Sequence, residues 1–261
     1  MPVFQAQGLR HYARLEGRPD ATPLLLLHPI GADHSLFDKV VPLLLPQFQV
    51  FRPDLRGHGG SEVPPQDCTL ADLAGDVLAL TQQLGWDRFA ACGVSLGGLA
   101  VLRAAIDAPQ RVSSLALCSS AAVMAPPPGG WDQRAAVARE QGLAGLASGM
   151  VERMFSAVHR SRQDPQVETL RRVFLHTHPE GYARCVAVLR DADLRPDLQR
   201  VQAPTLVMHG ALDGLITPEK IDVLCSGIPG ARQRRFDCGH FPPVEAPEAF
   251  ADALTQALAV G

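Results

Sequence analysis

The sequence has no segment long and apolar enough to suggest a membrane span. Its longest purely aliphatic run is residues 24–27, whereas a membrane span needs about 20 apolar residues. The first eight residues contain no basic stretch leading into an apolar segment, so no secretory signal is recognisable. We therefore expect a protein that has no membrane partner and is not exported.

Paired cysteine and histidine spacings are missing as well. Neither CxxC nor HxxxH occurs, and the six cysteines lie far apart along the chain. Two of the cysteines fall in apolar, strand-like runs, where a free thiol behaves as a small hydrophobic side chain. We expect reduced thiols, a cytoplasmic location and no metal ligands.

The charged residues show no excess of one sign. Lys and Arg number 24 against 27 Asp and Glu, which gives a net charge of −3, and no basic block stands out. A nucleic-acid partner is therefore not expected. Hydrophobic residues make up 46% of the 261 residues, enough for one large domain or two small ones with a core. The sequence contains no indication of an oligomeric state.

Short apolar runs alternate with longer helix-like segments, a pattern typical of an α/β fold with a mostly parallel central sheet flanked by helices. The predicted strands are 23–27, 48–51, 89–93, 112–118, 205–209 and 232–236, with 9–15 as an antiparallel edge strand. The predicted helices are 34–45, 69–84, 97–107, 218–226 and 246–258. Thr69 and Asp72 have the spacing of a helix start. Residues 232–236 are the most polar run and suit a sheet edge.

One segment interrupts this alternation. The run PPPGG at 126–130 marks a break, and helix-like segments follow at 131–147, 148–159, 165–176 and 179–190 without a clear strand. Such an insertion in a parallel sheet predicts a helical cap, residues 123–196, over the carboxyl ends of the strands, where ligands bind in open α/β sheets. Residues 1–122 and 197–261 would form the core.

The sequence GVSLGG at 93–98 lies between a predicted strand and a predicted helix. A G-x-S-x-G sequence in that position indicates a nucleophilic serine, because the tight turn needs glycines where side chains would collide. The turn would also direct the helix N-terminus at developing negative charge. Ser95 is therefore the candidate nucleophile, and an ordinary glycine-rich turn is the alternative.

A serine nucleophile needs a histidine base, and the histidine needs a carboxylate to orient it. His240 follows the last predicted strand, and Asp213 follows the strand before it, so both would lie at the same sheet edge as Ser95. Asp237 is the rival acid, only three residues from His240. We predict Asp213 and His240 as the partners of Ser95.

An oxyanion intermediate would need two backbone donors. The amide of Leu96, directly after the candidate nucleophile, is one candidate. The second should come from the loop after the first apolar strand. Because Pro29 has no N–H group, the amide of Ile30 is the better candidate there. His28 is expected to support that loop rather than to act as a second base.

These motifs resemble the α/β-hydrolase superfamily across almost the whole chain. The resemblance rests on HPIGAD (28–33), DLRGHGGS (54–61), GVSLGG (93–98), HGALD (209–213) and DCGH (237–240). Within the superfamily the cap is most similar to 3-oxoadipate enol-lactonases, through WDQR (131–134), ERMF (152–155), PEGYARC (179–185) and LRDADLR (189–195). The chain departs from that family at three positions: His28-Pro29 replaces Asn-Ser, and Met154 replaces a tryptophan.

The resemblance implies a cofactor-independent serine hydrolase of aromatic-compound degradation, in which Ser95 opens a small enol-lactone through an acyl-enzyme. Such a substrate carries a carboxylate, so the cap should supply a cation, for which Arg134 and Arg190 are the candidates. Each arginine could instead form a surface ion pair. Trp131 is a candidate wall of the site, or part of the cap packing.

Three other functions stay open at this point. A carboxylesterase or a C–C bond hydrolase would use the same scaffold on another small acyl substrate, and perhydrolase activity could accompany either. A ligand-binding protein without turnover is the third, although the intact set Ser95, Asp213 and His240 argues against it.

Overall fold

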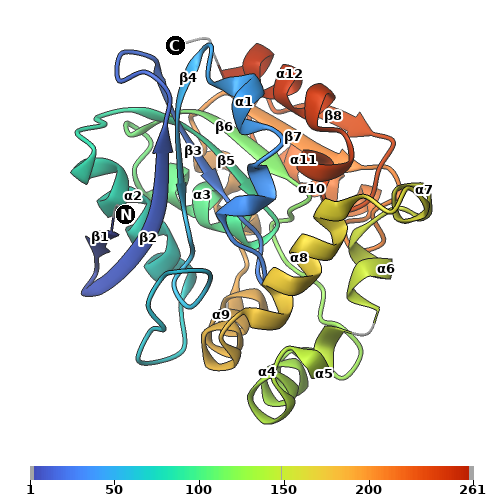
Figure 1. Cartoon of the computed structure of the whole chain (residues 1–261). Coiled ribbons are helices and arrows are strands. Elements are labelled where there is room, and N and C mark those ends of the chain that lie inside the picture. The colour runs from blue at the N-terminus through green and yellow to red at the C-terminus, as the bar shows by residue number, and fades with distance from the viewer. Residues whose placement is uncertain (1–2, 148, 259–261) are drawn as a thin grey trace.

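The computed structural model describes residues 3–147 and 149–258. In these ranges eight strands form one sheet in the order β1-β2-β4-β3-β5-β6-β7-β8 (Figure 1). Their bounds are Val3–Ala6 (β1), Leu9–Glu16 (β2), Thr22–Leu27 (β3), Phe48–Pro53 (β4), Phe89–Val94 (β5), Val112–Cys118 (β6), Thr205–Gly210 (β7) and Arg232–Phe236 (β8). The β1–β2 and β2–β4 pairings are antiparallel and all others are parallel, which confirms the predicted fold class.

The four leucines at 24–27 explain why the central strands are apolar on both faces. Leu25 and Leu27 belong to one hydrophobic cluster, and Leu24 and Leu26 belong to another on the opposite face. Successive side chains of a strand point to opposite faces, so a strand covered on both sides needs apolar residues at every position. The sheet is therefore buried between two layers of helices.

Five helices form the two layers that cover the sheet. The first cluster includes residues of α2 (Leu70–Gln83), α3 (Leu96–Asp107) and α10 (Pro218–Gly227), and the second those of α1 (Val41–Leu44) and α12 (Pro247–Leu258). Thr69 and Asp72 form the predicted start of α2, since each side chain accepts a hydrogen bond from the other residue's amide. The short helix α11 (Pro242–Glu245) precedes α12.

After a non-helical stretch at residues 119–129, most of the described chain between β6 and β7 is helical. It comprises α4 (Gly130–Gln141), α5 (Ala144–Ala147), α6 (Met150–Met154), α7 (Ala157–Ser161), α8 (Pro165–His176) and α9 (Pro179–Asp191), which gather at one end of the sheet in Figure 1. We call residues 123–196 the cap segment. A β-bridge between Val123 and Asp193 and a hydrogen bond from the Leu194 amide to the Ala122 carbonyl (2.9 Å) join its two ends.

Glycines let the cap segment approach the core closely. A Cβ atom on Gly57, in the loop after β4, would lie 2.5 Å from the Cα atom of Gly181 in α9. A Cβ atom on Gly181 would lie 2.3 Å from the Gly57 carbonyl oxygen. The backbones meet there without side chains between them, so either substitution would push the two regions apart.

Several predicted helices are divided in the structure. Residues 34–45 form a 3₁₀ turn, η1 (His34–Phe37), and a separate helix, α1, which begins at Val41 and has Pro42 in its first turn. Gly142, at a φ of +65°, separates α4 from α5, and Phe155 adopts an extended conformation between α6 and α7. Residue 148, where one helix was expected to start, lies outside the described residues. The helix predicted at 246–258 is undivided and is observed as α12, and α11 before it was not predicted.

Other differences concern short elements. Strand β1 was not predicted, because it has four residues and only Ala6 is buried. The antiparallel strand predicted at 9–15 is confirmed as β2, but its predicted edge position is wrong, because β1 pairs with its outer side. Its turn to β2 has positive φ at Gln7 and Gly8. The 3₁₀ helix η2 (Arg195–Arg200) was also not predicted. The predicted edge position of residues 232–236 is confirmed by β8.

All six cysteines are free thiols, and among them the Sγ atoms of Cys68 and Cys185 lie 3.7 Å apart. None of the helices in the described ranges combines the length and the apolar character that crossing a bilayer requires.

Candidate active site

Ser95 lies on the sharp turn between β5 and α3, as the sequence indicated. Its φ is +53°, in a region that side-chain-bearing residues rarely adopt. The amide of Ser95 donates to the Cys118 carbonyl (2.9 Å), and the Ser120 hydroxyl donates to the Ser95 carbonyl (2.9 Å). Neighbouring β6 therefore holds this strained backbone in place.

The flanking glycines are required by close backbone contacts. A Cβ atom on Gly93 would lie 2.2 Å from the carbonyl oxygen of Gly97. A Cβ atom on Gly97 would lie 2.3 Å from the carbonyl oxygen of Leu27, at the end of β3. No side chain fits at either distance, so the G-x-S-x-G spacing is a packing requirement of this turn. The second contact also brings the loop after β3 against the N-terminus of α3.

His240 and Asp213 are in direct contact. The Nδ1 atom of His240 lies 2.7 Å from Oδ2 of Asp213, and both side chains are almost fully buried. The other oxygen of Asp213 accepts hydrogen bonds from the amides of Leu215 (2.8 Å) and Ile216 (3.2 Å). The rival acid, Asp237, is exposed. The structure thus pairs His240 with Asp213, which fixes the ring so that Nε2 is its free nitrogen.

Burial alone would raise the pKa of Asp213. The charge and the hydrogen bond of His240, together with the amides of Leu215 and Ile216, outweigh burial and hold the pKa of Asp213 below its usual value. This carboxyl group therefore stays ionised at neutral pH. A fixed negative charge beside Nδ1 stabilises a proton taken up at Nε2.

Ser95 and His240 line the same cavity, whose volume is about 530 Å³. Pro29 and Ile30 from the loop after β3 line it too, beside the candidate nucleophile. The rest of the wall is largely apolar and comes from both the core and the cap segment, including Met124, Trp131, Leu146, Met154, Leu189 and Phe241. A cavity of this size suits a small-molecule ligand.

The loop of Ile30 is held by His28. The Nε2 atom of His28 accepts a hydrogen bond from the Leu55 amide (2.9 Å), so the ring proton is on Nδ1, which donates to the Pro29 carbonyl (2.8 Å). Burial lowers the pKa of His28 and keeps the ring neutral. His28 therefore supports this loop, and its two ring nitrogens are both in use.

The amide of Leu96 belongs to the first turn of α3, where N–H groups have no partner within the helix. The helix N-terminus carries a partial positive charge. With Ile30 in the cavity wall and Leu96 next to Ser95, the two amides predicted to bind an oxyanion lie on the two segments that Gly97 brings together.

Three cations line the cavity, and no carboxylate stands among the described residues of its wall. Arg134, from α4, donates through Nε to the Tyr182 hydroxyl (2.7 Å), and its guanidinium lies over that ring. Burial, together with the charge of Arg134, lowers the pKa of Arg153 in α6. Lys220, in α10, donates to the Leu215 carbonyl (2.5 Å). The wall is therefore electropositive.

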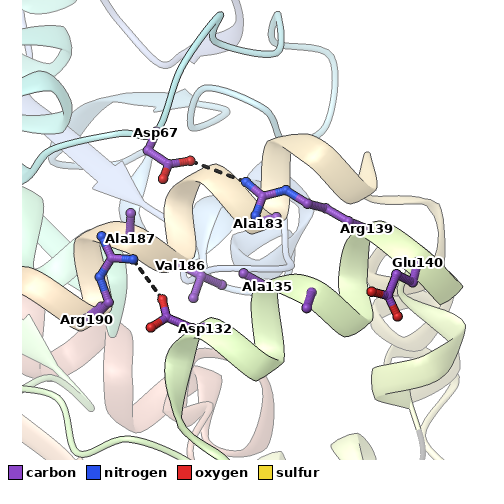
Figure 2. A pocket seen from close by; sticks show the side chains of 10 residues that line it. Asp67, Asp132, Ala135, Arg139, Glu140, Ala183, Val186, Ala187 and Arg190 are labelled. Atoms are coloured by element: carbon purple, nitrogen blue, oxygen red, sulfur yellow. Dashed lines mark hydrogen bonds and ion pairs between the residues drawn. The ribbon is translucent and has the colours of Figure 1, made fainter.

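Arg190 is not brought to this cavity. In Figure 2 its guanidinium lies at a different, surface pocket between α4 and α9, paired with Asp132 at 2.8 Å. Asp191 also accepts a hydrogen bond from it, at 2.7 Å. The neighbouring Leu189 lines the catalytic cavity instead. One residue further along an α-helix points about 100° away, which turns Arg190 outward.

Two cavity residues, Arg153 and Lys220, were missed in the sequence. The stretch ERMF, which contains Arg153, contributed to the family resemblance, but nothing in it indicated which of its side chains faces a ligand. Lys220 follows Pro218 in the first turn of α10, without a motif of its own. Trp131 and Arg134 do line the cavity, as do two of the three departures from the family pattern, Pro29 and Met154.

Comparison with known proteins extends these observations. The α/β-hydrolase fold family matches residues 22–247 of this chain. The chain is 31% identical over 260 residues to "3-oxoadipate enol-lactonase 2" of Acinetobacter baylyi, covering 97% of each chain. It is 30% identical to a "Pimeloyl-[acyl-carrier protein] methyl ester esterase" of Nitrosomonas europaea, covering 90% of this chain and 95% of the other.

Among solved structures, an enol-lactonase from Burkholderia xenovorans LB400 superposes with a TM-score of 0.94 at 35% identity, covering 98% of both chains. The extent of these matches confirms the fold predicted from the sequence and the resemblance to the enol-lactonases. The chain belongs to the α/β-hydrolase family and is a hydrolase.

Proposed function

We propose that this protein is a cofactor-independent serine hydrolase that opens a small, carboxylate-bearing enol-lactone. The observation that carries the proposal is the cavity itself, which is lined by Ser95 and His240 of the core and by Arg134 and Arg153 of the cap segment. A reactive hydroxyl facing a cationic, acid-free pocket suits an anionic acyl substrate. The similarity to proteins named enol-lactonases supports the same substrate class.

In the first step, the Ser95 hydroxyl oxygen attacks the lactone carbonyl while Nε2 of His240 takes its proton. Asp213 stabilises the resulting imidazolium through Nδ1. The carbonyl oxygen gains negative charge and binds the amides of Ile30 and Leu96. The ring C–O bond then breaks, and the leaving enol oxygen takes the proton from His240, which gives an acyl-enzyme that still holds the whole substrate.

In the second step, water replaces the enol as the reacting group. His240 removes a proton from water, the hydroxide attacks the acyl carbon, and the bond to Ser95 breaks as the serine recovers its proton. The enol tautomerises to a ketone. The product is a keto acid with one carboxylate more than the substrate. It then dissociates from the cavity.

The carboxylate that the substrate already carries is assigned to Arg134 and Arg153. Arg134 is held by the Tyr182 hydroxyl, so its guanidinium is fixed before a ligand arrives. Two neighbouring arginines repel one another, and an anion between them relieves that repulsion. Trp131 packs against clusters of both the core and the cap segment and would supply a flat apolar wall for the ring.

The test compares kcat/KM for 3-oxoadipate enol-lactone with that for uncharged p-nitrophenyl esters of the same acyl length and for a ring-fission dienone. We expect the lactone to be preferred by at least tenfold. Addition of a carboxylate to the ester should also improve kcat/KM. If uncharged esters react far faster than every lactone tried, the lactonase assignment is wrong.

A carboxylesterase is the second candidate, favoured by the similarity to the methyl ester esterase. It would use the same Ser95, His240 and Asp213, since an ester and a lactone present the same carbonyl to the nucleophile. The comparison above separates the two candidates. A C–C bond hydrolase would instead turn over the dienone, and a binding protein would turn over none of the three.

A further inference from the structure

The backbone of the candidate base, His240, is hydrogen-bonded to the cap segment. The His240 amide donates to the Met154 carbonyl (2.8 Å), and Met154 also lines the cavity. The neighbouring Gly239 amide donates to Oε1 of Glu245 (2.9 Å). Residues 239 and 240 are thus tied on one side to the end of α6 and on the other to the end of α11.

Glu245 itself bridges the core and the cap segment. Besides the Gly239 amide, its carboxyl group accepts hydrogen bonds from the Ser156 amide (3.2 Å) and the Ser156 hydroxyl. Ser156 is buried at the junction of α6 and α7, and its hydroxyl oxygen accepts in turn from the His159 amide in the first turn of α7. Three donors from two regions therefore converge on one carboxylate.

The packing around Gly239 leaves little room for movement. A Cβ atom there would lie 2.8 Å from Oε1 of Glu245, 2.8 Å from the Met154 carbonyl oxygen and 2.8 Å from the Ser156 nitrogen. On the opposite side, a Cβ atom on Gly210 would lie 1.9 Å from the Gly239 carbonyl oxygen. The 239–240 backbone is enclosed between the end of β7, the cap segment and Glu245.

Phe155 reinforces this junction with apolar contacts. Its ring meets the ring of Phe241 edge to face at 5.4 Å, and it stacks on His159 at 5.9 Å. Phe241 lines the cavity directly after His240. Within the segment 154–156, the Met154 carbonyl therefore binds the His240 amide, the Phe155 ring packs on the next residue, Phe241, and Ser156 binds Glu245.

From this geometry we propose that Glu245 is a positioning residue for the reaction: with Ser156 it holds His240 at the distance from Ser95 and Asp213 that proton transfer requires. The proposal rests on the proposed function, in which His240 is the base. A displacement of about 1 Å at a catalytic group can reduce the rate about a hundredfold. Glu245 acts through the 239–240 backbone and need not touch the substrate.

The test is Glu245→Gln, which keeps the size of the side chain but leaves one acceptor oxygen for three donors. The matched control is Glu248→Gln, the same change at an exposed position of the first turn of α12. With p-nitrophenyl acetate, the burst of product counts the working sites. We expect kcat per counted site to fall at least tenfold in Glu245→Gln with KM changed less than threefold, and no change in Glu248→Gln.

A merely structural role would give a different result, in which the number of working sites falls but the rate per site is that of the wild type. That outcome, or an unchanged enzyme, overturns the proposal. Ser156→Ala provides a milder test that keeps the bond from Gly239 to Glu245, and we expect at least a threefold loss in rate per site. An unchanged rate there would count equally against it.

His240→Ala is measured in parallel, because the two proposals can fail separately. If His240→Ala is inactive and Glu245→Gln is fully active, only the positioning role of Glu245 is overturned. If His240→Ala retains wild-type turnover, the proposed base is wrong and the role of Glu245 falls with it.

Discussion

The carboxyl edge of the sheet and the cap segment are built in different ways. At the sheet edge, Ser95, Asp213 and His240 are nearly or fully buried, and glycines meet backbone at distances that admit no side chain. The cap segment contains helices as short as α5, α6 and α7, and many of its charged residues form exposed ion pairs such as Arg190 with Asp132. Exposed pairs contribute little to stability.

This difference indicates that the two regions contribute differently to the chemical step and to substrate binding. Close packing and buried hydrogen bonds at the sheet edge fix the reacting atoms, so changes there should affect the chemical step. The helices α4 and α6 of the cap segment supply two of the three cations of the cavity, Arg134 and Arg153, so changes of these side chains should affect which substrate binds. Residues 154–156 of the cap segment belong with the sheet edge in this respect, because they contact the backbone of His240 and Glu245. Variants in the two regions should therefore change different kinetic parameters.

The largest effect is expected at the sheet edge, from Ser95→Ala. Loss of the nucleophile should reduce kcat for p-nitrophenyl acetate by about 10⁴-fold or more, because the amides and the cavity alone give only residual catalysis. The thermal unfolding midpoint should stay close to that of the wild type, since only a hydroxyl is removed. Retained turnover in the folded variant would mean that Ser95 is not the nucleophile.

The next effect separates the two candidate acids. Asp213→Asn keeps the shape of the side chain but no longer favours the ring tautomer that leaves Nε2 as the acceptor, and we expect kcat to fall by about 10³- to 10⁴-fold. Asp237→Asn is the matched control at an exposed position, and its kcat should stay within twofold of the wild-type value. Equal losses in the two variants would contradict the pairing of His240 with Asp213.

The sheet edge could be predicted from the sequence because its positions follow from strand order. Residues that directly follow parallel strands meet at one edge, so Ser95, Asp213 and His240 were located together without a structure. The turn glycines could be recognised for a similar reason, since they precede and follow the serine at fixed spacing. Strand order and the spacing of glycines around Ser95 were therefore sufficient to predict the residues at the sheet edge.

The cap segment could not be predicted in the same detail, because the direction of each side chain depends on how its short helix packs. Arg134 and Arg190 looked equivalent in sequence, yet α9 turns Leu189 to the cavity and Arg190 to the surface. The breaks at Gly142 and Phe155 set the rotation of the helices that follow. Arg153 lies in the short helix α6 and lines the cavity, although no motif in the sequence indicates the orientation of that helix.

A smaller effect, confined to substrate binding, is expected from the cap segment. Arg134→Ala should raise KM for the carboxylate-bearing lactone by about 10- to 100-fold, the loss of one charge-assisted contact, and leave kcat/KM for p-nitrophenyl acetate within threefold. Arg190→Ala, also in the cap segment but facing the other pocket, is the control and should change neither. A loss of activity on both substrates in Arg134→Ala would place this arginine in the chemical step instead.

The smallest effect concerns the boundary between the two regions. His58 lies in the loop after β4, its ring centroid 6.4 Å from that of Tyr182 in α9. Complete burial of the ring lowers the pKa of His58 to about 3. The unfolded chain would bind a proton at this ring near pH 6.5, whereas the folded chain would not. The stability associated with the neutral ring is therefore present above about pH 6.5 and lost as the pH falls toward 3.

His58→Asn removes this titration and retains a side-chain donor for the Arg56 carbonyl, which lies 3.1 Å from Nδ1 in the wild type. The cavity left by the ring should lower the stability of the variant at neutral pH. The two proteins are therefore compared by how steeply the free energy of unfolding changes with pH. Between pH 6 and 4 the free energy of unfolding, measured with urea, should fall more steeply in the wild type by up to about 1.4 kcal/mol per pH unit. Parallel slopes would mean that water reaches His58, and that the cap segment covers the sheet edge less tightly than the contact between Gly57 and Gly181 implies.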